Sequence, residues 1–572
     1  MSSNSKKHCI LYPVVKFSTI REMMELAVEA AGSQTAFKYK TADDTVAEVS
    51  YSEFYDTVNT LGASLTSLGA LDSHDSHIAI IGENSYRWVS VYLTTLMSRG
   101  VFVPIDKELP EIDIINIIKE SDSTVLFYSK RYNDMITNRS FELTNIKYFI
   151  CLDGDAKEYG GDRFLSYDQV LENGDRSHSY LDEYTSMETE PDALKMLVYT
   201  SGTTGMAKGV MLSEHNLVSS IYYGLQVSTV YETALSVLPY HHTYEAVSGI
   251  LVSLHKHATI CINENLRAVS KNFAIYQPDY IYLVPAFVEE FYKRIWANAE
   301  KTGKAASLKK LMSVSNGMRK VGIDLRRKLF SPVLSAFGGK LKKIVCGGAP
   351  IRAELGEFFD TIGIDLINGY GITECSPLVS ANQDKFNDCA TVGFPLPCCD
   401  VTFDDVSSDG EGEICVKGDV VMMGYYKNQK QTDEVLIDGV FHTGDYGKMN
   451  EYGQLMITGR KKNLIVLRNG KNIFPEEIEN YIISIPYVKE VVVYSLKDAD
   501  GGEYRLCAEV FLNEEKIAEI DIQNIPDRLR TDISANLAHL PNYKHIGKVI
   551  IRKHEFDKTT SQKIKRSSIE GE

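Results

Sequence analysis

Short apolar segments that alternate with helical patterns constrain the fold of this chain more than any other feature. HIAII at 77–81 and VFVPI at 101–105 resemble buried strands, and the segment between them, around Trp88 and Leu96, has helical spacing. A strand–helix–strand order implies a parallel sheet. Similar apolar segments recur at 125–128, 148–152, 196–200, 280–284 and 343–346. The sequence therefore predicts an α/β fold whose large N-terminal domain has parallel or mixed sheets with packed helices.

The pattern changes after about residue 460. Pro475 is placed to open a helix whose apolar face contains Ile478 and Ile482, and strand-like segments follow at 491–494 and 506–511. This pattern predicts a small α+β domain over 461–572, after a large domain over 1–460, with a boundary near Arg460.

Composition excludes several classes of protein. The chain has 61 Lys and Arg against 77 Asp and Glu, a net charge of −16, which argues against a broad nucleic-acid-binding surface. No stretch approaches the ~18 consecutive apolar residues that span a bilayer. The ten scattered cysteines fit reduced thiols. We expect a cytoplasmic protein without a transmembrane segment, which a substrate with a long apolar tail could still bring into peripheral contact with a membrane.

The segment YTSGTTGMAKGV at 199–210 is the strongest functional motif. A predicted strand leads directly into a loop that is rich in glycine, serine and threonine and is followed by Lys208. Glycines let backbone N–H groups surround a phosphate, hydroxyls donate to its oxygens, and a lysine adds a compact positive charge. Because the spacing differs from the P-loop pattern, the motif predicts a phosphate-binding loop of another type.

Two further motifs suit a nucleotide. In NGYGITE at 368–374, Tyr370 has a flat face for a purine, Thr373 can donate to a phosphate, and Glu374 is a hard oxygen ligand for Mg²⁺. In FHTGDYG at 441–447, which lies between strand-like segments, the carboxylate of Asp445 can accept two hydrogen bonds.

The segment SGTTGMAKG resembles the phosphate loop of the adenylate-forming superfamily, which includes acyl- and aryl-CoA ligases, luciferases and peptide-synthetase adenylation domains. The other motifs follow in that family's order over nearly the whole chain. The resemblance implies ATP, Mg²⁺ and coenzyme A as cofactors, with Glu374 and Thr200 at the metal. It implies that the nucleotide is bound by Ser201, Gly202, Thr203, Thr204, Gly205, Lys208, Gly348, Ala349, Pro350, Asn368, Gly369, Tyr370, Gly371, Thr373, Asp445 and Arg460.

The same resemblance assigns roles near the end of the chain. Lys462 matches the hinge position about which the small domain swings between two half-reactions. KTTSQKIKR at 558–566 is similar to the family motif PKTxxGKIxR, so Lys563 matches the lysine that contacts the α-phosphate and the acyl carboxylate during adenylation. Asp557 and Gln562 depart from that motif, which affects the geometry of the loop that delivers Lys563.

The segment LPYHHTYE at 238–245 matches the border of the family's acyl pocket, with His242 near the carboxylate. It lacks the aspartate that holds an amino-acid substrate. Acetate-activating relatives have tryptophan at the position of Gly371, so glycine there implies an open pocket. VPIDKELP at 103–110 and VGFPLPC at 392–398 most resemble bacterial long-chain fatty acyl-CoA synthetases.

Several functions stay open at this stage. The leading hypothesis is an AMP-forming ligase that joins a carboxylic acid, by resemblance a long-chain fatty acid, to coenzyme A. The second is an adenylating enzyme that loads an acyl carrier protein. An aryl-acid ligase, a luciferase-like oxygenase and a non-catalytic nucleotide-binding homologue are more remote, and the last is expected to lack Glu374, Asp445 or Lys563, all of which are present.

Overall fold

The computed structural model describes residues 9–71, 73–154, 161–175, 178–200, 207–466, 472–496, 505–520, 524–558, 564 and 566. They fall into two compact units. Unit 1 consists of Met1–Val401, Val416–Phe441 and Asn450–Leu455, and unit 2 consists of Thr402–Cys415, His442–Met449 and Met456–Glu572.

One sheet of unit 1 has eight strands and carries the predicted phosphate loop. Its order is β19 (Gly424–Tyr425), β9 (Lys208–Ser213), β8 (Leu194–Thr200), β4 (Val101–Pro104), β3 (His77–Ile81), β5 (Val125–Tyr128), β6 (Tyr148–Cys151) and β7 (Phe164–Ser166). Strands β8, β4, β3, β5, β6 and β7 run parallel, whereas β9 returns antiparallel to β8. The apolar segments at 77–81, 101–105 and 125–128 are therefore neighbouring parallel strands, as predicted.

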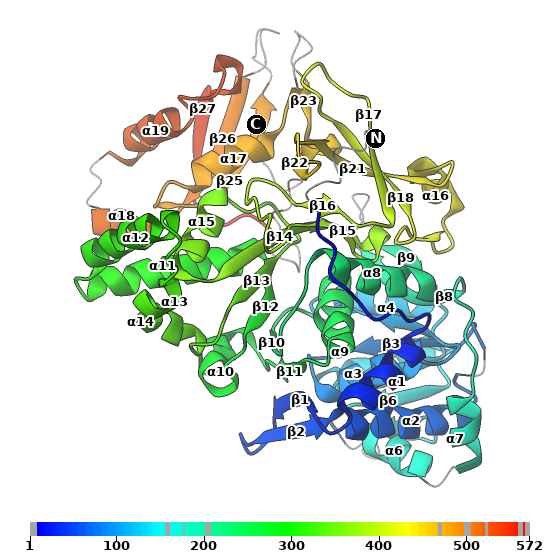
Figure 1. The fold of residues 1–572 in the computed structure, drawn as a ribbon. Helices are drawn as coiled ribbons and strands as arrows, with labels where there is room; N and C mark the ends of the chain where they lie inside the picture. Colours follow the sequence, from blue (N-terminus) through cyan, green and yellow to red (C-terminus); the bar gives the residue numbers. More distant parts are fainter. Residues whose placement is uncertain are drawn as a thin grey trace. The chain divides into compact units, whose positions relative to one another are not determined.

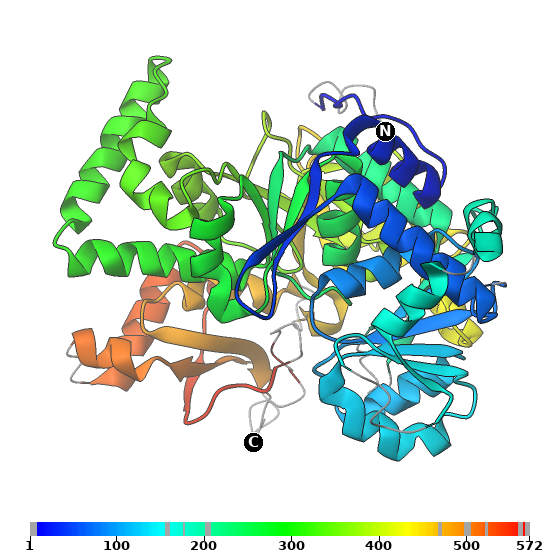
Figure 2. The same cartoon turned by 90° about the horizontal axis from the view of Figure 1, so that it is seen from below.

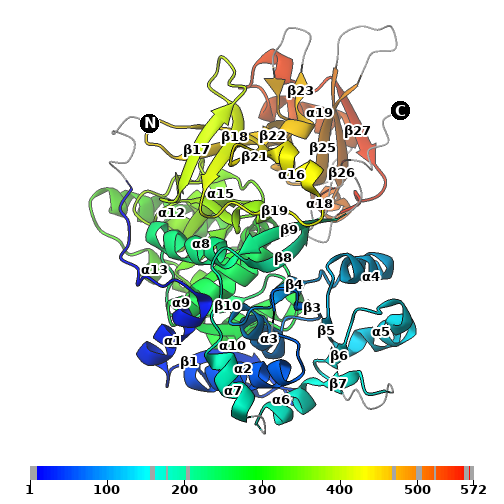
Figure 3. The same cartoon turned by 90° about the vertical axis from the view of Figure 1, so that its right-hand side faces the viewer.

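Helices cover both faces of this sheet. Consecutive residues of its central strands are apolar, so each face of the sheet carries apolar side chains that must be buried. On one face, Ile114 and Ile118 of α4 (Glu111–Glu120) join a buried cluster with Ala79 and Val101. On the other, Trp88 of α3 (Tyr86–Leu96) meets the ring of Phe102 edge-on, with ring centroids 5.2 Å apart. Figure 3 shows α4 and α3 on opposite sides of β3.

The second sheet of unit 1 has nine strands. Its order is β16 (Phe394–Pro395), β15 (Leu378–Ala381), β14 (Asp365–Gly371), β13 (Lys343–Cys346), β12 (Tyr280–Leu283), β10 (Thr233–Ser236), β11 (Thr259–Ile262), β1 (Thr35–Lys40) and β2 (Val46–Ser50). The strands from β14 to β1 pair in parallel, and the edges at β15 and β2 pair antiparallel (Figure 1). The carboxyl ends of β13 and β14, where the glycine-rich motifs lie, thus meet at one edge of the sheet.

The remaining helices of unit 1 connect and cover these strands. They are α1 (Ile20–Ala31), α2 (Tyr51–Ser67), α5 (Asn133–Arg139), α6 (Tyr167–Asp175), α7 (His178–Thr185), α8 (Glu214–Val227), α9 (Val252–His255), α10 (Val269–Tyr276), α11 (Pro285–Lys301), α12 (Ala305–Lys320), α13 (Arg326–Leu329), α14 (Ser331–Leu334), α15 (Ala353–Ile362) and α16 (Gln429–Val435). In Figure 2, the long green helices α11 and α12 extend away from the sheets of unit 1.

Unit 2 contains the predicted α+β region. Strands β25 (Val488–Leu496), β26 (Arg505–Leu512) and β27 (Lys548–Arg552) form a sheet, and α17 (Pro475–Ile483), α18 (Glu514–Ile520) and α19 (Ile525–Asn536) accompany it. Ile478 and Ile482 of α17 are fully buried with Val493 and Ile533, so the predicted helix face forms the core. Pro475 occupies the first turn of α17, as its sequence position predicted.

Four strands contain residues of both units: β17 (Cys399–Asp404), β18 (Gly412–Gly418), β21 (Val440–Met449) and β22 (Leu455–Arg460). With β20 (Leu436–Ile437) they form a five-stranded sheet, and β23 (Ile465–Val466) pairs with β24 (Asn472–Ile473). The α/β class, with a large N-terminal part and a small α+β part, is confirmed. A single domain boundary at Arg460 stays a prediction.

Candidate functional site

The phosphate-loop motif joins two paired strands. Thr200 ends β8, Lys208 begins β9, and these two residues lie directly opposite each other in the antiparallel pair. Strand pairing therefore fixes the two residues that flank the central part of the motif. The predicted ligands Ser201, Gly202, Thr203, Thr204 and Gly205 lie outside the described residues.

Glu374 lies in a cluster with Tyr425 and Lys208. The hydroxyl of Tyr425 donates to Oε1 of Glu374 over 2.9 Å, and the ammonium of Lys208 lies 4.9 Å from the centre of the Tyr425 ring. Glu374 follows β14 in a 3₁₀ turn and is 9% exposed, so its carboxylate is largely withdrawn from water. Burial, followed by the neighbouring Glu374, raises the pKa of Tyr425, which therefore stays a hydroxyl donor. Tyr425 thus contacts both Glu374, the predicted metal ligand, and Lys208, which follows the phosphate loop.

Tyr425 was not among the predicted site residues. It lies 51 positions beyond Glu374 in a two-residue edge strand that pairs with β9. Neither hydrophobic periodicity nor a glycine pattern marks it, so only the three-dimensional pairing of β19 with β9 identifies it.

The two glycine-rich motifs lie side by side at the carboxyl ends of β13 and β14. Cys346 pairs with Asn368, so the turn containing Gly348, Ala349 and Pro350 leaves the sheet beside Gly369 and Tyr370. Gly348 has φ of +82°, a conformation that glycine adopts readily. This arrangement brings the predicted adenine-binding residues together, with Asn368 and Thr373 buried.

Gly371 has a structural constraint of its own. A Cβ atom at this position would lie 2.2 Å from the carbonyl oxygen of Pro377, which is far inside van der Waals contact. Glycine is therefore required here by the backbone of the following turn. Its predicted effect on the acyl pocket stays a prediction.

The two histidines of the acyl-pocket motif differ in environment. His242 is exposed, and its carbonyl oxygen accepts hydrogen bonds from Glu245 and Ala246 at the start of the next helix. His241 is largely buried, with Nε2 3.5 Å from Oδ1 of Asp106, which was not among the predicted site residues. Burial lowers the pKa of His241 to about 4, with Asp106 opposing that shift, so its imidazole is neutral at physiological pH.

Glu245, in the same segment, is an acidic residue whose side chain is almost completely buried. It lies in a π-helix at Tyr244–Leu251, is 1% exposed, and accepts a hydrogen bond from the hydroxyl of Ser236. Its carboxyl group lies directly against Gly249, where a Cβ atom would be 2.7 Å from the carboxyl carbon. Single π-turns are often found at functional sites. Burial raises the pKa of Glu245 to about 8, so the group is mainly protonated at neutral pH.

Glu245 is expected to make the folded state less stable as pH rises. The folded pKa of about 8 exceeds the ordinary value of 4.5, so the folded protein holds a proton that the unfolded chain releases between these values. The loss between pH 5 and pH 7 corresponds to about 3 kcal/mol. Melting temperatures measured across this range should fall less steeply for Glu245→Gln than for the unsubstituted protein. Parallel curves for the two proteins would contradict a buried neutral carboxyl group.

In unit 2 the structure brings Asp445 and Arg460 together. Nε of Arg460 lies 2.9 Å from Oδ1 of Asp445, which is 4% exposed. The backbone N–H of Asp445 donates to Oγ1 of Thr443, and that of Gly444, with φ of +71°, donates to Oε1 of Glu413. The motif at 441–447 lies within strand β21, which corrects the prediction that it lies between strands. Its departure from regular strand geometry at Gly444 explains why the glycine pattern resembled a loop.

The hinge and lysine motifs are described only in part. Lys462 lies in a 3₁₀ turn, Lys461–Asn463, directly after β22. Lys563 lies outside the described residues, whereas Ile564 forms a β-bridge with Lys558, and Arg566 pairs with Glu479 at 2.6 Å.

Comparison with known protein families identifies the family to which this chain belongs. Residues 24–426 match the AMP-binding enzyme family, and residues 477–563 match the AMP-binding enzyme C-terminal domain. The chain belongs to the AMP-binding enzymes. The predicted membership of the adenylate-forming superfamily is confirmed.

Relatives of this AMP-binding enzyme include long-chain-fatty-acid–CoA ligases. It is 27% identical over 520 residues to long-chain-fatty-acid–CoA ligase 1 of Homo sapiens, which covers 84% of this chain and 73% of that protein. It is 28% identical over 470 residues to long-chain-fatty-acid–CoA ligase FadD15 of Mycobacterium tuberculosis, covering 78% of this chain and 75% of that protein.

Solved structures share the fold of this AMP-binding enzyme. The anthranilate CoA ligase AuaEII in complex with anthranoyl-AMP superposes with a TM-score of 0.74 at 16% identity, covering 99% of this chain and 97% of that one. ATP-bound MatB from Rhodopseudomonas palustris gives 0.73 at 21% identity, covering 96% and 97%. In the described part of the chain, no helix is both long enough and apolar enough to cross a bilayer.

Proposed function

We propose that this AMP-binding enzyme activates a long-chain fatty acid with ATP and transfers the acyl group to coenzyme A. In the first half-reaction a carboxylate oxygen attacks the α-phosphorus of ATP, pyrophosphate leaves, and acyl-AMP forms. In the second, the thiol of coenzyme A attacks the acyl carbonyl carbon, the bond to AMP breaks, and the thiol proton is released to solvent. The cluster of Glu374, Tyr425 and Lys208 beside the phosphate loop is the observation that supports adenylation most directly.

The residues of unit 1 divide the work of the first half-reaction. Lys208, with the loop between β8 and β9, would bind phosphate oxygens, because a lysine and loop amides offset their charge. The edge formed by the turn at 347–350 and by Tyr370 would receive the adenine ring. Catalysis of such transfers depends mainly on positioning and charge stabilisation, which suits residues held on strand ends.

The donor set near Glu374 also suits Mg²⁺. This ion binds hard oxygen ligands and typically takes one or two carboxylates together with substrate phosphates. The hydroxyl of Tyr425 orients the carboxylate of Glu374, and the ring of Tyr425 contacts Lys208, which follows the phosphate loop. Thr200 ends the strand that enters that loop. Glu374 and Thr200 would hold the ion, which would screen the phosphate charge.

In unit 2, Asp445 and Arg460 would bind the ribose hydroxyls. A carboxylate accepts two hydrogen bonds, and the contact with the guanidinium of Arg460 orients this one. The preference for a long acyl chain rests on the fatty-acid relatives and on the open pocket that we infer at Gly371.

Product analysis tests this proposal. The purified protein, MgATP and coenzyme A are incubated with an equimolar pool of fatty, aryl and amino acids, and products are identified by mass spectrometry. We expect AMP and acyl-CoA, with long-chain thioesters most abundant and none from the amino acids. Acyl-AMP without thioester would favour an acyl-carrier-protein acceptor, and a predominance of aryl thioesters would replace the fatty-acid assignment. AMP release that needs none of the acids would contradict acid activation.

A further inference from the structure

A basic segment projects from unit 1, in contrast to the acidity of the whole chain. Residues 293–328, which run from α11 through α12 to α13, contain eleven Lys and Arg but only two acidic residues, Glu300 and Asp324. The net charge of the full chain is −16. A positive potential is therefore concentrated on one small group of helices, which lie together at one edge of unit 1 (Figure 1).

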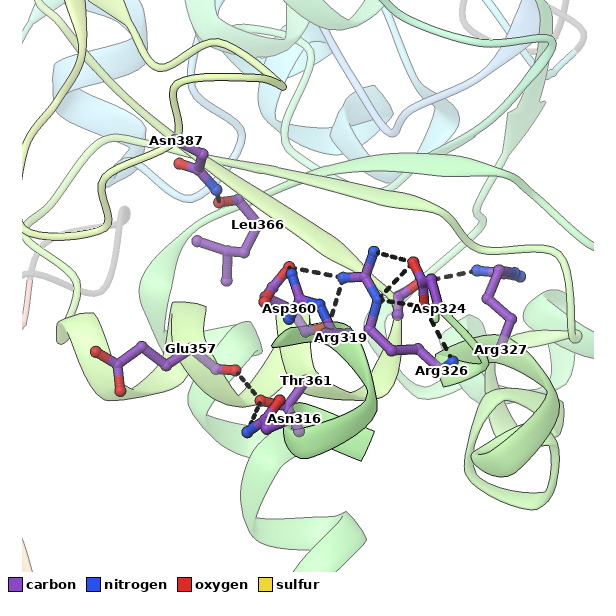
Figure 4. Close-up of polar contacts among 11 residues, drawn as sticks. Asn316, Arg319, Asp324, Arg326, Arg327, Glu357, Asp360, Thr361, Leu366 and Asn387 are labelled. Carbon is purple, nitrogen blue, oxygen red and sulfur yellow. Dashed lines mark hydrogen bonds and ion pairs between the residues drawn. The ribbon is translucent and has the colours of Figure 1, made fainter. Parts of the chain in front are cut away.

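The arginines of this segment are engaged in holding its fold. Arg319 and Arg326 both reach Asp360 on α15, at 2.5 and 2.7 Å, and Arg326 also pairs with Asp324 (Figure 4). Arg327 donates to the carbonyl oxygens of Leu341 and Gly363. These contacts fix the turn after α12 against α15, so the turn has a defined position.

The lysines differ from the arginines, because five of them are directed to solvent. All five are exposed, and none forms an ion pair or side-chain hydrogen bond with another described residue. They are Lys301, Lys304, Lys310, Lys320 and Lys328. Lys293 instead pairs with Glu289, and Lys309 lies over the ring of Trp296. Five unneutralised positive charges are thus available to an external anion.

Exposed apolar side chains occupy the same surface. Val314 is 47% exposed and Val321 is 73% exposed, and Ile323 and Leu325 follow in the turn after α12. No other window of twelve described residues holds four exposed large apolar side chains. At 100° per residue, Lys310, Val314 and Val321 lie on one face of α12 and its extension, opposite the buried Leu308 and Ser315. Lys310 and the exposed valines therefore share one amphipathic face of α12, and Lys320 and Lys328 flank the apolar turn that follows it.

We propose that this surface, formed by the exposed face of α12 and the turn at 321–325, docks the enzyme onto an anionic lipid bilayer. Lysines beside an anionic membrane each contribute to attraction within a Debye length, and aliphatic side chains between them enter the headgroup boundary. An anionic bilayer thus offers charged headgroups to the lysines and an apolar region to the aliphatic side chains. The inference goes beyond the proposed reaction.

A nucleic acid fits the same surface less well. Its phosphates would neutralise the lysines, but single strands are held by stacking on exposed aromatic rings. The exposed side chains at 314–325 are valine, isoleucine and leucine, which would stay in water against a phosphate backbone. The apolar half of the surface therefore favours lipid.

Vesicle flotation tests the proposal without ATP, acid or coenzyme A, so its result is independent of the proposed reaction. The whole protein is mixed with phosphatidylcholine vesicles that contain or lack about 30% phosphatidylglycerol, an anionic lipid. We expect binding to the anionic vesicles alone, weakened by high salt. Combining Lys310→Gln, Lys320→Gln and Lys328→Gln should weaken that binding roughly 100-fold. Val321→Ser with Ile323→Ser should weaken it without changing the charge.

A matched control carries the same loss of charge elsewhere on unit 1. Lys256→Gln, Lys385→Gln and Lys430→Gln replace exposed lysines outside the helical segment and should leave vesicle binding unchanged. Thermal melting confirms that each variant is folded. Equal vesicle binding by the two triple-lysine variants, absence of binding to anionic vesicles, or lysine-dependent binding to duplex DNA alone would each overturn the proposal.

Discussion

Replacing Glu374 by glutamine is expected to lower acid-dependent ATP–pyrophosphate exchange by about 10²–10³-fold, the usual effect of removing one electrostatic group from a polar active site. Glutamine keeps the size of the side chain and an oxygen that can accept from Tyr425. The substitution therefore removes the negative charge with little change in packing. Kinetics at several Mg²⁺ concentrations should show that the variant needs more of the ion for half-maximal rate, because a carboxylate ligand is lost.

Tyr425→Phe is the companion variant. It removes the hydroxyl that orients Glu374 but leaves the carboxylate charge and the aromatic face beside Lys208. Loss of one hydrogen bond to a charged group should reduce exchange by roughly tenfold, much less than Glu374→Gln. If Glu374→Gln retained exchange within a factor of three, with an unchanged Mg²⁺ requirement, Glu374 would not hold the ion. Equal losses in the two variants would instead indicate that the hydrogen bond matters more than the charge.

Local patterns in the sequence predicted the elements that position the site. The buried strand at 77–81 is a run of apolar residues, and the helix at 475 starts with proline, so each is specified by nearby residues. The strand that leads into the phosphate-loop motif was predicted as well, whereas its pairing with a returning strand at Lys208 was found only in the structure. The predicted features need no information about the rest of the chain.

Contacts between distant segments were not predictable in the same way. Tyr425 reaches Glu374 only because β19 pairs with β9, and Asp106 reaches His241 only because two loops converge. The strand around Asp445 resembled a loop because Gly444 adopts a positive φ within it. The amphipathic surface on α12 could not be predicted from the sequence, because the sequence does not show which lysines and arginines already form ion pairs. The arginines and the lysines look alike in sequence, but only the arginines contact Asp360 and the carbonyl oxygens.

Lys563 is expected to matter in one half-reaction alone. By the family resemblance, its ammonium contacts the α-phosphate and the acyl carboxylate while the mixed anhydride forms. Lys563→Ala should therefore lower ATP–pyrophosphate exchange by about 10²–10³-fold, since one charge-stabilising group is removed. Thioester formation from supplied acyl-AMP and coenzyme A should stay within a factor of three of the unsubstituted enzyme, because the phosphate charge no longer has to be stabilised.

The two assays separate a catalytic lysine from a structural one. Nearby structure in unit 2 depends on Lys558, which pairs with Glu490 at 2.5 Å, and on Arg566, which pairs with Glu479. A lysine that only supported these contacts would reduce both half-reactions together and lower the melting temperature. Lys553→Ala, at an exposed lysine of the same unit, is the matched control and should change neither assay. Full exchange activity in Lys563→Ala would show that another cation stabilises the transition state. Asp557 and Gln562 depart from the family motif. A partial loss of exchange with intact thioester formation would therefore still place Lys563 in adenylation.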